Sequence, residues 1–359
     1  MANRQSQLPE DRPAVATWAQ VRYAWLLAIL FVALLNVWAT RAGKRLLARM
    51  PGGIAAKWAE TERRGRAAQW VVLGDSAGGA GVDPVALGTQ LGGSCLNLAL
   101  PSGQPLLGAW MLDSYIQHHG APRGVVVVHV YDIWPRGVTV QTISRVPLPW
   151  GFWDTIRPPV RLTLGERLEM VMSRRFMLYA ERNLWRRQLT NAPAILKQLV
   201  RPATPAPAQQ QPTLSQTLGF TPMRRQSFSD LAWDLASHQA NLRRPQFAFR
   251  VSPVNRAGVQ HMLELARQHD FQIYFAPAPI DERIAAEPGF QRWQRDLFRT
   301  LTELTAGEPR AHVLSELPNV FPERDLANTV DHLLEPAAQR YTRQLADAVQ
   351  RQEPTRAPR

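Results

Sequence analysis

Short runs of apolar and β-branched residues alternate with longer segments in which apolar residues recur every three or four positions. The runs cover 69–74, 95–100, 124–130, 271–276 and 311–314, and their continuous apolar character is typical of strands covered on both faces. The longer segments predict helices over about 105–119, 255–268, 291–305 and 336–350, and Asp83 and Pro84 predict a further helix start. Strands and helices that alternate at this spacing predict an α/β domain with a parallel sheet.

The longest apolar run, residues 23–39, has no charged residue and carries Trp25 and Trp38 near its ends. Its length is close to the lower limit for crossing a bilayer, and the tryptophans with their basic flanks resemble an interfacial belt. We expect a single membrane anchor that contacts membrane lipid. A cleaved signal peptide and a buried core helix are the alternatives. Lys and Arg are more frequent after the run than before it, which taken alone places the rest of the chain in the cytoplasm.

These patterns divide the chain into a polar segment (1–22), an anchor (23–40), a charged connector (41–68) and an α/β domain in two parts (69–136 and 251–352). Residues 137–250 break the rhythm with helical stretches rich in Trp and Arg over about 165–189 and with a Pro- and Gln-rich linker near 201–215. We interpret 137–250 as a helical insertion in the α/β domain.

The composition narrows the choice of partners. Apolar residues make up 45% of the 359 residues, enough for a large core, and the net charge of +13 comes mostly from scattered arginine pairs. No basic arm, zinc-finger spacing or RNA-binding motif accompanies this charge, so we expect attraction to anionic surfaces and no nucleic-acid partner. The single cysteine, Cys95, excludes an internal disulfide. No spaced set of ligands points to a metal, and no phosphate-binding or dinucleotide motif points to a cofactor.

The first strand ends in Gly74, Asp75 and Ser76, followed by a cluster of glycines over 78–81. This pattern predicts a tight turn that displays the Ser76 hydroxyl, and small neighbours leave room for an acyl carbon and for backbone N–H groups aimed at an oxyanion. Ser76 is therefore a candidate nucleophile. An ordinary turn between a strand and a helix is the alternative.

Parallel sheets bind their ligands at the carboxyl ends of the strands. The turns after the first three strands offer Ser76, then Asn97 and Gly103, then Tyr131 and Asp132. A serine nucleophile needs a base, and His332, just before the last helix, is the candidate. A surface histidine at a helix entry is the alternative for His332. His129, inside the third strand, is interpreted as a core histidine whose ring nitrogens are hydrogen-bonded.

The chain resembles the SGNH/GDSL hydrolase superfamily, especially its membrane-anchored bacterial branch of envelope-polymer acyl esterases and O-acetyltransferase-like proteins. The resemblance rests on residues 73–76 (Leu-Gly-Asp-Ser), 97–103 (Asn-Leu-Ala-Leu-Pro-Ser-Gly) and 331–334 (Asp-His-Leu-Leu), and it covers about 69–135 and 250–350. It implies a flavodoxin-like three-layer sandwich with a central parallel sheet. It also implies Ser76 as nucleophile, His332 as base, and the N–H groups of Ser76 and Gly103 as oxyanion donors.

The sequence departs from the family pattern at two positions. Asp132 occupies the neighbourhood of an asparagine that donates to the oxyanion, and Thr329 stands where the orienting aspartate is usual, so Asp331 or Asp325 would have to orient His332. The hypothesis is a membrane-tethered serine esterase or O-acyltransferase of the bacterial inner membrane, with its catalytic domain outside the cytoplasm. Its expected substrate is an acylated envelope polysaccharide, with a membrane-bound acyltransferase as a possible partner. The alternative is an inactive SGNH-like scaffold that binds a polymer or assembles a membrane complex.

Overall fold

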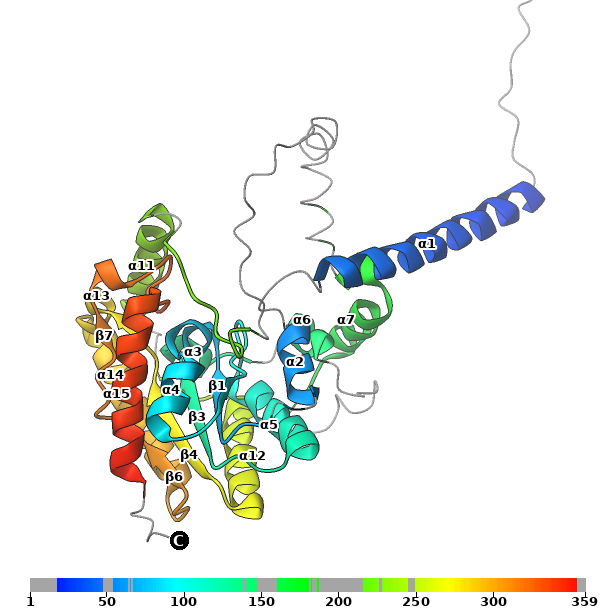
Figure 1. Cartoon of the computed structure of the whole chain (residues 1–359). Helices are drawn as coiled ribbons and strands as arrows, with labels where there is room; N and C mark the ends of the chain where they lie inside the picture. Colours follow the sequence, from blue (N-terminus) through cyan, green and yellow to red (C-terminus); the bar gives the residue numbers. More distant parts are fainter. Residues whose placement is uncertain are drawn as a thin grey trace, which may run out of the picture.

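A computed structural model shows an α/β protein with one long N-terminal apolar helix (Figure 1). The structure describes residues 18–47, 54–63, 65, 67–137, 140–146, 160–180, 182, 186, 216–225, 228–244 and 249–353. The segments 1–17 and 201–215, for which the sequence predicts a polar N-terminus and a Pro- and Gln-rich linker, lie outside these residues.

A parallel five-stranded sheet with the order β2-β1-β3-β4-β6 forms the centre. Its strands are β1 (Trp70–Gly74), β2 (Cys95–Asn97), β3 (Gly124–His129), β4 (Gln272–Pro277) and β6 (Ala311–Val313). All five predicted strands are therefore present, and this order of strands is the one found in flavodoxin-like sheets. A second, two-stranded parallel pair was not predicted: β5 (Ile280–Asp281) pairs with β7 (Val320–Phe321).

Helices cover both faces of the sheet. The helices of the α/β domain are α3 (Ser76–Gly81), α4 (Pro84–Leu91), α5 (Pro105–His119), α12 (Pro253–His269), α13 (Glu282–Ala285), α14 (Pro288–Thr305) and α15 (Glu335–Gln352). Helices α5 and α12 pack together on one face, while α3 and α4 pack against α15 on the other (Figure 1). Short 3-10 helices lie at Tyr131–Ile133 (η1) and Glu323–Asp325 (η3).

The central strands are buried because both faces are covered. Val71 and Val72 of β1 and Val125 and Val126 of β3 are fully buried, and burial of a valine side chain contributes about 1.5–3 kcal/mol to folding. Gly74 ends β1 at φ +153°, where a Cβ would lie 1.9 Å from the carbonyl oxygen of Val128. The glycine thus permits the close approach of two strands at the point where the chain turns toward Ser76.

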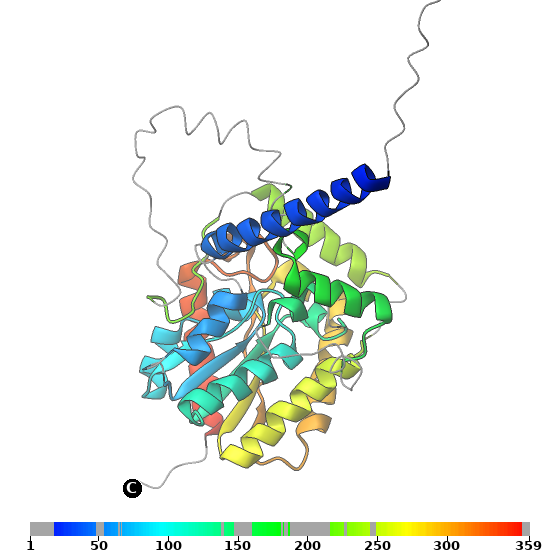
Figure 2. The same ribbon diagram turned by 90° about the vertical axis from the view of Figure 1, so that its right-hand side faces the viewer.

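Helix α1 (Trp18–Leu47) contains the predicted anchor and is longer than the predicted range 23–40. Its segment Val21–Arg41 is long and apolar enough to cross a membrane, and only 6% of its most apolar window is buried in the protein. A core helix would be mostly buried, so this exposure argues against the core-helix alternative. Helix α1 lies at one end of the molecule and the last turns of α15 lie at the other (Figures 1 and 2).

The connector contains helix α2 (Ile54–Glu62), which docks onto the sheet edge beside β2. Lys57 of α2 is 1% exposed, and its Nζ donates hydrogen bonds to the carbonyl oxygens of Asn97, at 3.0 Å, and of Gly219. Burial lowers the pKa of Lys57 to about 7, although the charge of Glu60 opposes this shift. The connector is thus part of the folded domain and not only a spacer.

The predicted insertion contributes α6 (Val140–Arg145), α7 (Leu164–Arg175), α8 (Met177–Ala180) and α11 (Phe228–Leu242). Helices α7 and α8 lie within the helical stretches predicted over 165–189, and α7 ends where Phe176 adopts an extended backbone. Most residues from 181 to 189 lie outside the described part of the chain. Helix α11 reaches the carboxyl edge of the sheet, as its contacts with Tyr131 and Val330 show.

Candidate functional site

The corner after β1 is held by Asp75, whose side chain is fully buried. Its Oδ1 accepts a hydrogen bond from the Ala77 N–H at 2.8 Å and its Oδ2 accepts one from the Val130 N–H at 2.7 Å. The first bond caps α3, because an aspartate at this position satisfies a donor that the helix leaves open. The second bond ties the same corner to the end of β3.

Ser76, the predicted nucleophile, is the first residue of α3 and is half-buried. Among the described residues no atom forms a hydrogen bond with its hydroxyl or with its backbone N–H. The N–H of a first helical residue has no partner inside the helix. Among the described residues, the hydroxyl and the backbone N–H of Ser76 therefore both lack a hydrogen-bond partner. Acyl transfer requires these two groups, the first as nucleophile and the second as a donor to the oxyanion.

Asn97, a predicted substrate-binding residue, is used by the fold. Its Nδ2 donates to the carbonyl oxygens of Gly78, at 3.0 Å, and Val82, at 2.8 Å, and its Oδ1 accepts from the Ala99 N–H at 3.0 Å. The side chain is fully buried. Both amide hydrogens are thus occupied in joining α3 to the end of β2, so none is available for a ligand.

Gly103, a predicted oxyanion donor, packs against the start of the Ser76 corner. A Cβ on this residue would lie 2.4 Å from the carbonyl oxygen of Gly74, so the close approach requires glycine. Its N–H donates to the Leu100 carbonyl at 2.8 Å. In this structure the N–H is therefore committed to the turn, and the Ser76 N–H is the predicted donor that has no partner.

Asp132, in the turn after β3, forms an ion pair with Arg136 four residues later. The turn itself is fixed by the fully buried Asn255, whose Nδ2 donates to the carbonyl oxygens of Ile133 and Trp134, each at 2.9 Å. An aspartate paired in this way carries its negative charge at the edge of the sheet. It cannot donate a hydrogen bond to an oxyanion, as the asparagine of the family pattern would.

His332, the predicted base, is 14% exposed and lies three residues before α15. Its Nδ1 lies 3.3 Å from Oδ1 of Asn328, and its Nε2 lies 3.9 Å from Oδ1 of Asp331. When Nδ1 carries the proton, it donates to Asn328 and leaves Nε2 free to accept a second proton. Asn328 is therefore the group that orients the imidazole, and Asp331 contacts the other nitrogen.

Ser76 and His332 are not hydrogen-bonded to each other in this structure. They nevertheless belong to one edge of the sheet, because Asp75 bonds to Val130 after β3 while α11 bonds to both Tyr131 and Val330. Burial raises the pKa of Asp331, the charge of His332 lowers it, and the carboxylates of Asp75 and Asp132 raise it again. Asp331 thus lies within electrostatic range of the corner that carries Ser76 and of the turn that carries Asp132.

Helix α11 supplies two residues that the sequence does not single out, Asp234 and His238. Oδ2 of Asp234 accepts a hydrogen bond from the Val330 N–H at 2.9 Å, and its Oδ1 lies 3.6 Å from Nε2 of His238. Nδ1 of His238 lies 2.6 Å from the hydroxyl of Tyr131, whose pKa is raised by burial first and then by the charge of Asp132. This series of side-chain contacts joins the turn after β3 to the turn that holds His332.

The only sequence signal for these two residues is their spacing of four on one face of a helix. This spacing is common in surface ion pairs, so it carries no information about a partner about one hundred positions away. By contrast, the sequence alone identifies both Ser76 and His332 as edge residues. It does not identify Asn328 as the partner of Nδ1, because the family pattern directs attention to Asp331 or Asp325. Asp325 instead forms an ion pair with Arg340 of α15.

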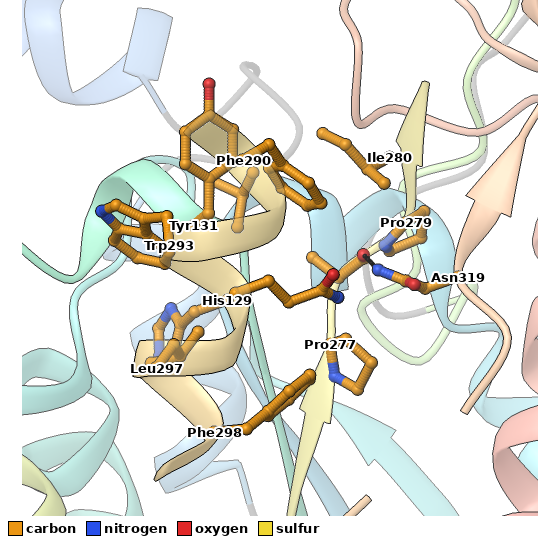
Figure 3. Close-up of a pocket in the computed structure, with 13 residues that line it drawn as sticks. His129, Tyr131, Pro277, Pro279, Ile280, Phe290, Trp293, Leu297, Phe298 and Asn319 are labelled. Atoms are coloured by element: carbon orange, nitrogen blue, oxygen red, sulfur yellow. Dashed lines mark hydrogen bonds between the residues drawn. The ribbon is translucent and has the colours of Figure 1, made fainter. Parts of the chain in front are cut away.

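A mostly apolar pocket lies between α14 and the ends of β3 and β4 (Figure 3). His129 lines it together with Trp293, Leu297 and Phe298. The interpretation of His129 as a core histidine is right about its burial, since it is 3% exposed, and wrong about its bonding. Among the described residues neither ring nitrogen has a hydrogen-bond partner, although Nδ1 lies 3.8 Å from Oδ2 of Asp75. Ser76 and His332 do not line this pocket. We therefore do not assign it to the candidate site.

Within the described part of the chain, no group of three or more His, Cys, Asp or Glu side chains could hold a metal ion. The acidic side chains at the edge are instead committed to ion pairs, helix caps and backbone N–H groups. The chain matches no model of a known protein family and no curated protein sequence. The assignment of the candidate site therefore rests on the geometry of its residues.

Proposed function

We propose that this protein is a membrane-tethered serine esterase or O-acyltransferase that acts on acyl esters of a cell-envelope polysaccharide. The observation that carries the proposal is the Ser76 corner: a half-buried hydroxyl with no hydrogen-bond partner among the described residues, beside an unpaired N–H at a helix start. A hydroxyl in this setting can approach an acyl carbon, and the adjacent N–H can bind the oxygen that becomes negative.

The proposed reaction has two steps. Ser76 Oγ forms a bond to the acyl carbon while its proton passes to Nε2 of His332, and collapse of the tetrahedral species breaks the ester bond and returns that proton to the departing alcohol. Water or a sugar hydroxyl then attacks the acyl-serine and His332 accepts its proton. Collapse of this second tetrahedral species breaks the bond between the acyl carbon and Ser76 Oγ, which takes the proton back from His332, and gives a free acid in the first case and a new ester in the second.

The roles of Asn328 and Asp331 follow from their contacts. Oδ1 of Asn328, 3.3 Å from Nδ1 of His332, accepts a hydrogen bond when Nδ1 is protonated and so favours the tautomer whose Nε2 is basic. The Asp331 carboxylate, 3.9 Å from Nε2, stabilises the imidazolium that forms during the reaction. Productive transfer requires Nε2 to move into hydrogen-bond distance of Ser76, since the two side chains are not bonded in the structure.

The position of the site in the molecule suits a membrane-bound role. Helix α15 begins three residues after His332, and its last turns lie at the end of the molecule opposite α1 (Figures 1 and 2). The start of α15, and with it the candidate site, thus lies toward the end from which α1 leaves. With α1 as a single anchor, we place the domain outside the cytoplasm of a bacterial inner membrane, despite the basic residues that follow the anchor.

Hydrolysis of p-nitrophenyl acetate by the full chain in detergent micelles tests the chemistry. Ser76→Ala and His332→Ala should each lower the rate by at least about a thousandfold, because nucleophile and base act as a unit. Ser102→Ala is the matched control, since Ser102 is an exposed serine in the neighbouring turn and should keep the wild-type rate. Equal rates in all four proteins would refute the proposed reaction.

A catalytically inactive scaffold is the second candidate, and three observations favour it. The Gly103 N–H donates to Leu100, Asp132 carries a negative charge where the family pattern has an amide donor, and Ser76 is not bonded to His332. A scaffold of this kind would bind its polymer without cleaving any ester. Retained polymer binding together with background hydrolysis in the wild-type protein would select it.

A reporter fused to the C-terminus tests the proposed side of the membrane. Alkaline phosphatase folds into an active enzyme only where its disulfides form, so the fusion should be active if the domain is extracytoplasmic. A fluorescent protein that matures only in the cytoplasm should stay dark at the same position. The reverse pattern would place the domain in the cytoplasm, as the basic residues after the anchor suggest.

A further inference from the structure

Helix α7 of the insertion exposes a continuous apolar face. Leu164 is 67% exposed and Leu168 is 55% exposed, and Val171 and Met172 are also exposed. At 3.6 residues per turn, these four positions lie within about 100° of the helix circumference. Large apolar side chains that form one stripe on a helix mark an interaction surface more often than scattered ones do.

The buried face of α7, opposite the exposed stripe, fixes the direction in which the stripe points. Met170 is fully buried and belongs to a small apolar cluster with Ile143 of α6, Val160 and Leu162. A capping box formed by Thr163 and Glu166 sets the start of the helix. Because Met170 is held in this cluster, α7 cannot turn its exposed stripe toward the α/β domain without losing that packing.

The C-terminal end of α7 contacts the membrane helix. Nδ2 of Asn36 in α1 donates to the carbonyl oxygen of Arg175 at 3.2 Å, and α8, which follows α7, packs against α1. Helices α1 and α7 lie next to each other in both views (Figures 1 and 2). Asn36 lies five residues before Arg41, where the apolar span ends, and at about 1.5 Å per residue this is roughly 7–8 Å inside the span.

This depth and the charges around α7 fit the boundary between lipid headgroups and acyl chains. Interfacial helices bury their apolar face about 5–10 Å deep in that boundary. Arg161 before α7 and Arg175 at its end are exposed, and long basic side chains at helix ends can reach anionic headgroups while their stems cover apolar surface. The occupant that matches both the stripe and the charges is a lipid surface.

We propose that α7 lies in the membrane interface with Leu164, Leu168, Val171 and Met172 in contact with lipid. The α/β domain would then be held at two places, by α1 across the bilayer and by α7 along its surface. This arrangement would fix the orientation of the domain and keep the Ser76 edge at a constant distance from the membrane. The inference depends on α1 as a membrane anchor, which is part of the proposed function, and it does not depend on ester chemistry.

Spin labels on single cysteines test this arrangement in the full chain. The protein is reconstituted into vesicles of phosphatidylethanolamine and phosphatidylglycerol, with labels introduced by Leu168→Cys in α7, Leu30→Cys in α1 and Val85→Cys in α4. Val85 is the matched control, because it is an apolar residue 59% exposed on a helix of the α/β domain. The native Cys95 does not interfere, since it is buried and burial raises the pKa of its thiol.

The Leu168→Cys label should be more accessible to oxygen than to a water-soluble nickel chelate, while the Val85→Cys label should show the opposite order. Leu30→Cys should resemble a lipid-exposed site and thereby report on the anchor itself. A water-exposed label at 168 with a lipid-exposed label at 30 would overturn the role of α7 and leave the anchor intact. A label at 168 that is shielded from both reagents would mean that protein covers the stripe, which would also overturn it.

Discussion

The two halves of the candidate site are built in different ways. The Ser76 corner is held by neighbours that are close in sequence or in the sheet: Asp75 bonds to Ala77 and to Val130 at the end of the adjacent strand. The His332 turn has local bonds of its own, such as the one from the Ala327 N–H to the His332 carbonyl, and it is also held by partners about one hundred positions earlier. Among these, Asp234 accepts from the Val330 N–H and Arg225 donates to the Leu326 carbonyl. The nucleophile is thus placed by a local motif, while the base depends in addition on tertiary contacts from the insertion.

This difference has a consequence for stability and activity. Damage to the Ser76 corner should destabilise the central sheet, because its hydrogen bonds are buried and belong to β1 and β3. Damage to the contacts of the His332 turn should affect its position more than the stability of the domain, because those contacts are partly exposed. Variants of Asp75 and Asp234 separate the effect on stability from the effect on activity.

Asp75→Ala should have the largest effect on stability. It removes the acceptor for two buried N–H groups, and the loss should be roughly 2–4 kcal/mol in the free energy of unfolding. Asp83→Ala is the matched control, because Asp83 also caps a helix, through Val85 and Ala86, but is only half-buried. It should cost about 1 kcal/mol. Urea unfolding of the full chain in detergent micelles measures both, and equal losses would contradict a special role for the corner.

A variant of Lys57 tests whether the connector helix α2 also stabilises the edge of the sheet that carries the candidate site, at the end of β2. Its pKa falls to about 7 in the folded protein because burial disfavours the charged form, so the unfolded state binds more protons between about pH 7 and pH 10.5. The free energy of unfolding should therefore rise with pH across this window. Relative to Lys57→Met, the wild-type protein should gain on the order of 2–3 kcal/mol between pH 7 and pH 9.5.

The measurement for Lys57 is urea unfolding of both proteins at several pH values. The variant serves as the control for all other titrating groups, so only the difference between the two curves counts. Parallel curves would mean that Lys57 is solvated and charged in the folded protein, and that α2 does not dock through it.

Asp234→Ala should have the smallest effect on stability and a clear effect on the reaction. Its side chain is 18% exposed, so water can replace part of the lost bond to Val330 and the cost should be about 1 kcal/mol. A shift of the His332 turn by about 1 Å should lower the hydrolysis rate by roughly tenfold to a hundredfold. The exposed Asp230, one turn earlier on α11, provides the control variant Asp230→Ala. Equal activities of the two variants would remove Asp234 from the site.

The sequence predicts the strands well because each is a short, continuous run such as 124–129, and such runs form strands buried on both faces. It also predicts the caps at Asp83 and the turn at Ser76, which depend on residues within three positions. The pairing of β5 with β7 could not be predicted, since each strand has only two residues. The roles of Asn97 and Gly103 differ from the expectation because the fold uses the same groups that a ligand would need.

The position of α11 in the fold could not be predicted from the sequence either. Its first residues follow a segment of low complexity, and the amphipathic pattern of Phe228–Leu242 indicates a helix without indicating its partner. Only the structure shows that Asp234 bonds to Val330 and that His238 bonds to Tyr131. Part of the predicted insertion therefore helps to build the candidate site.

In the proposed reaction Ser76 is a reactive nucleophile and His332 is its base. The most direct measurement is labelling of the full chain in native membranes with a fluorophosphonate, followed by identification of the modified peptide by mass spectrometry. We expect a label on Ser76 that disappears in Ser76→Ala and is strongly reduced in His332→Ala. Absence of labelling in the wild-type protein, or equal labelling of the Ser76→Ala variant, would contradict it.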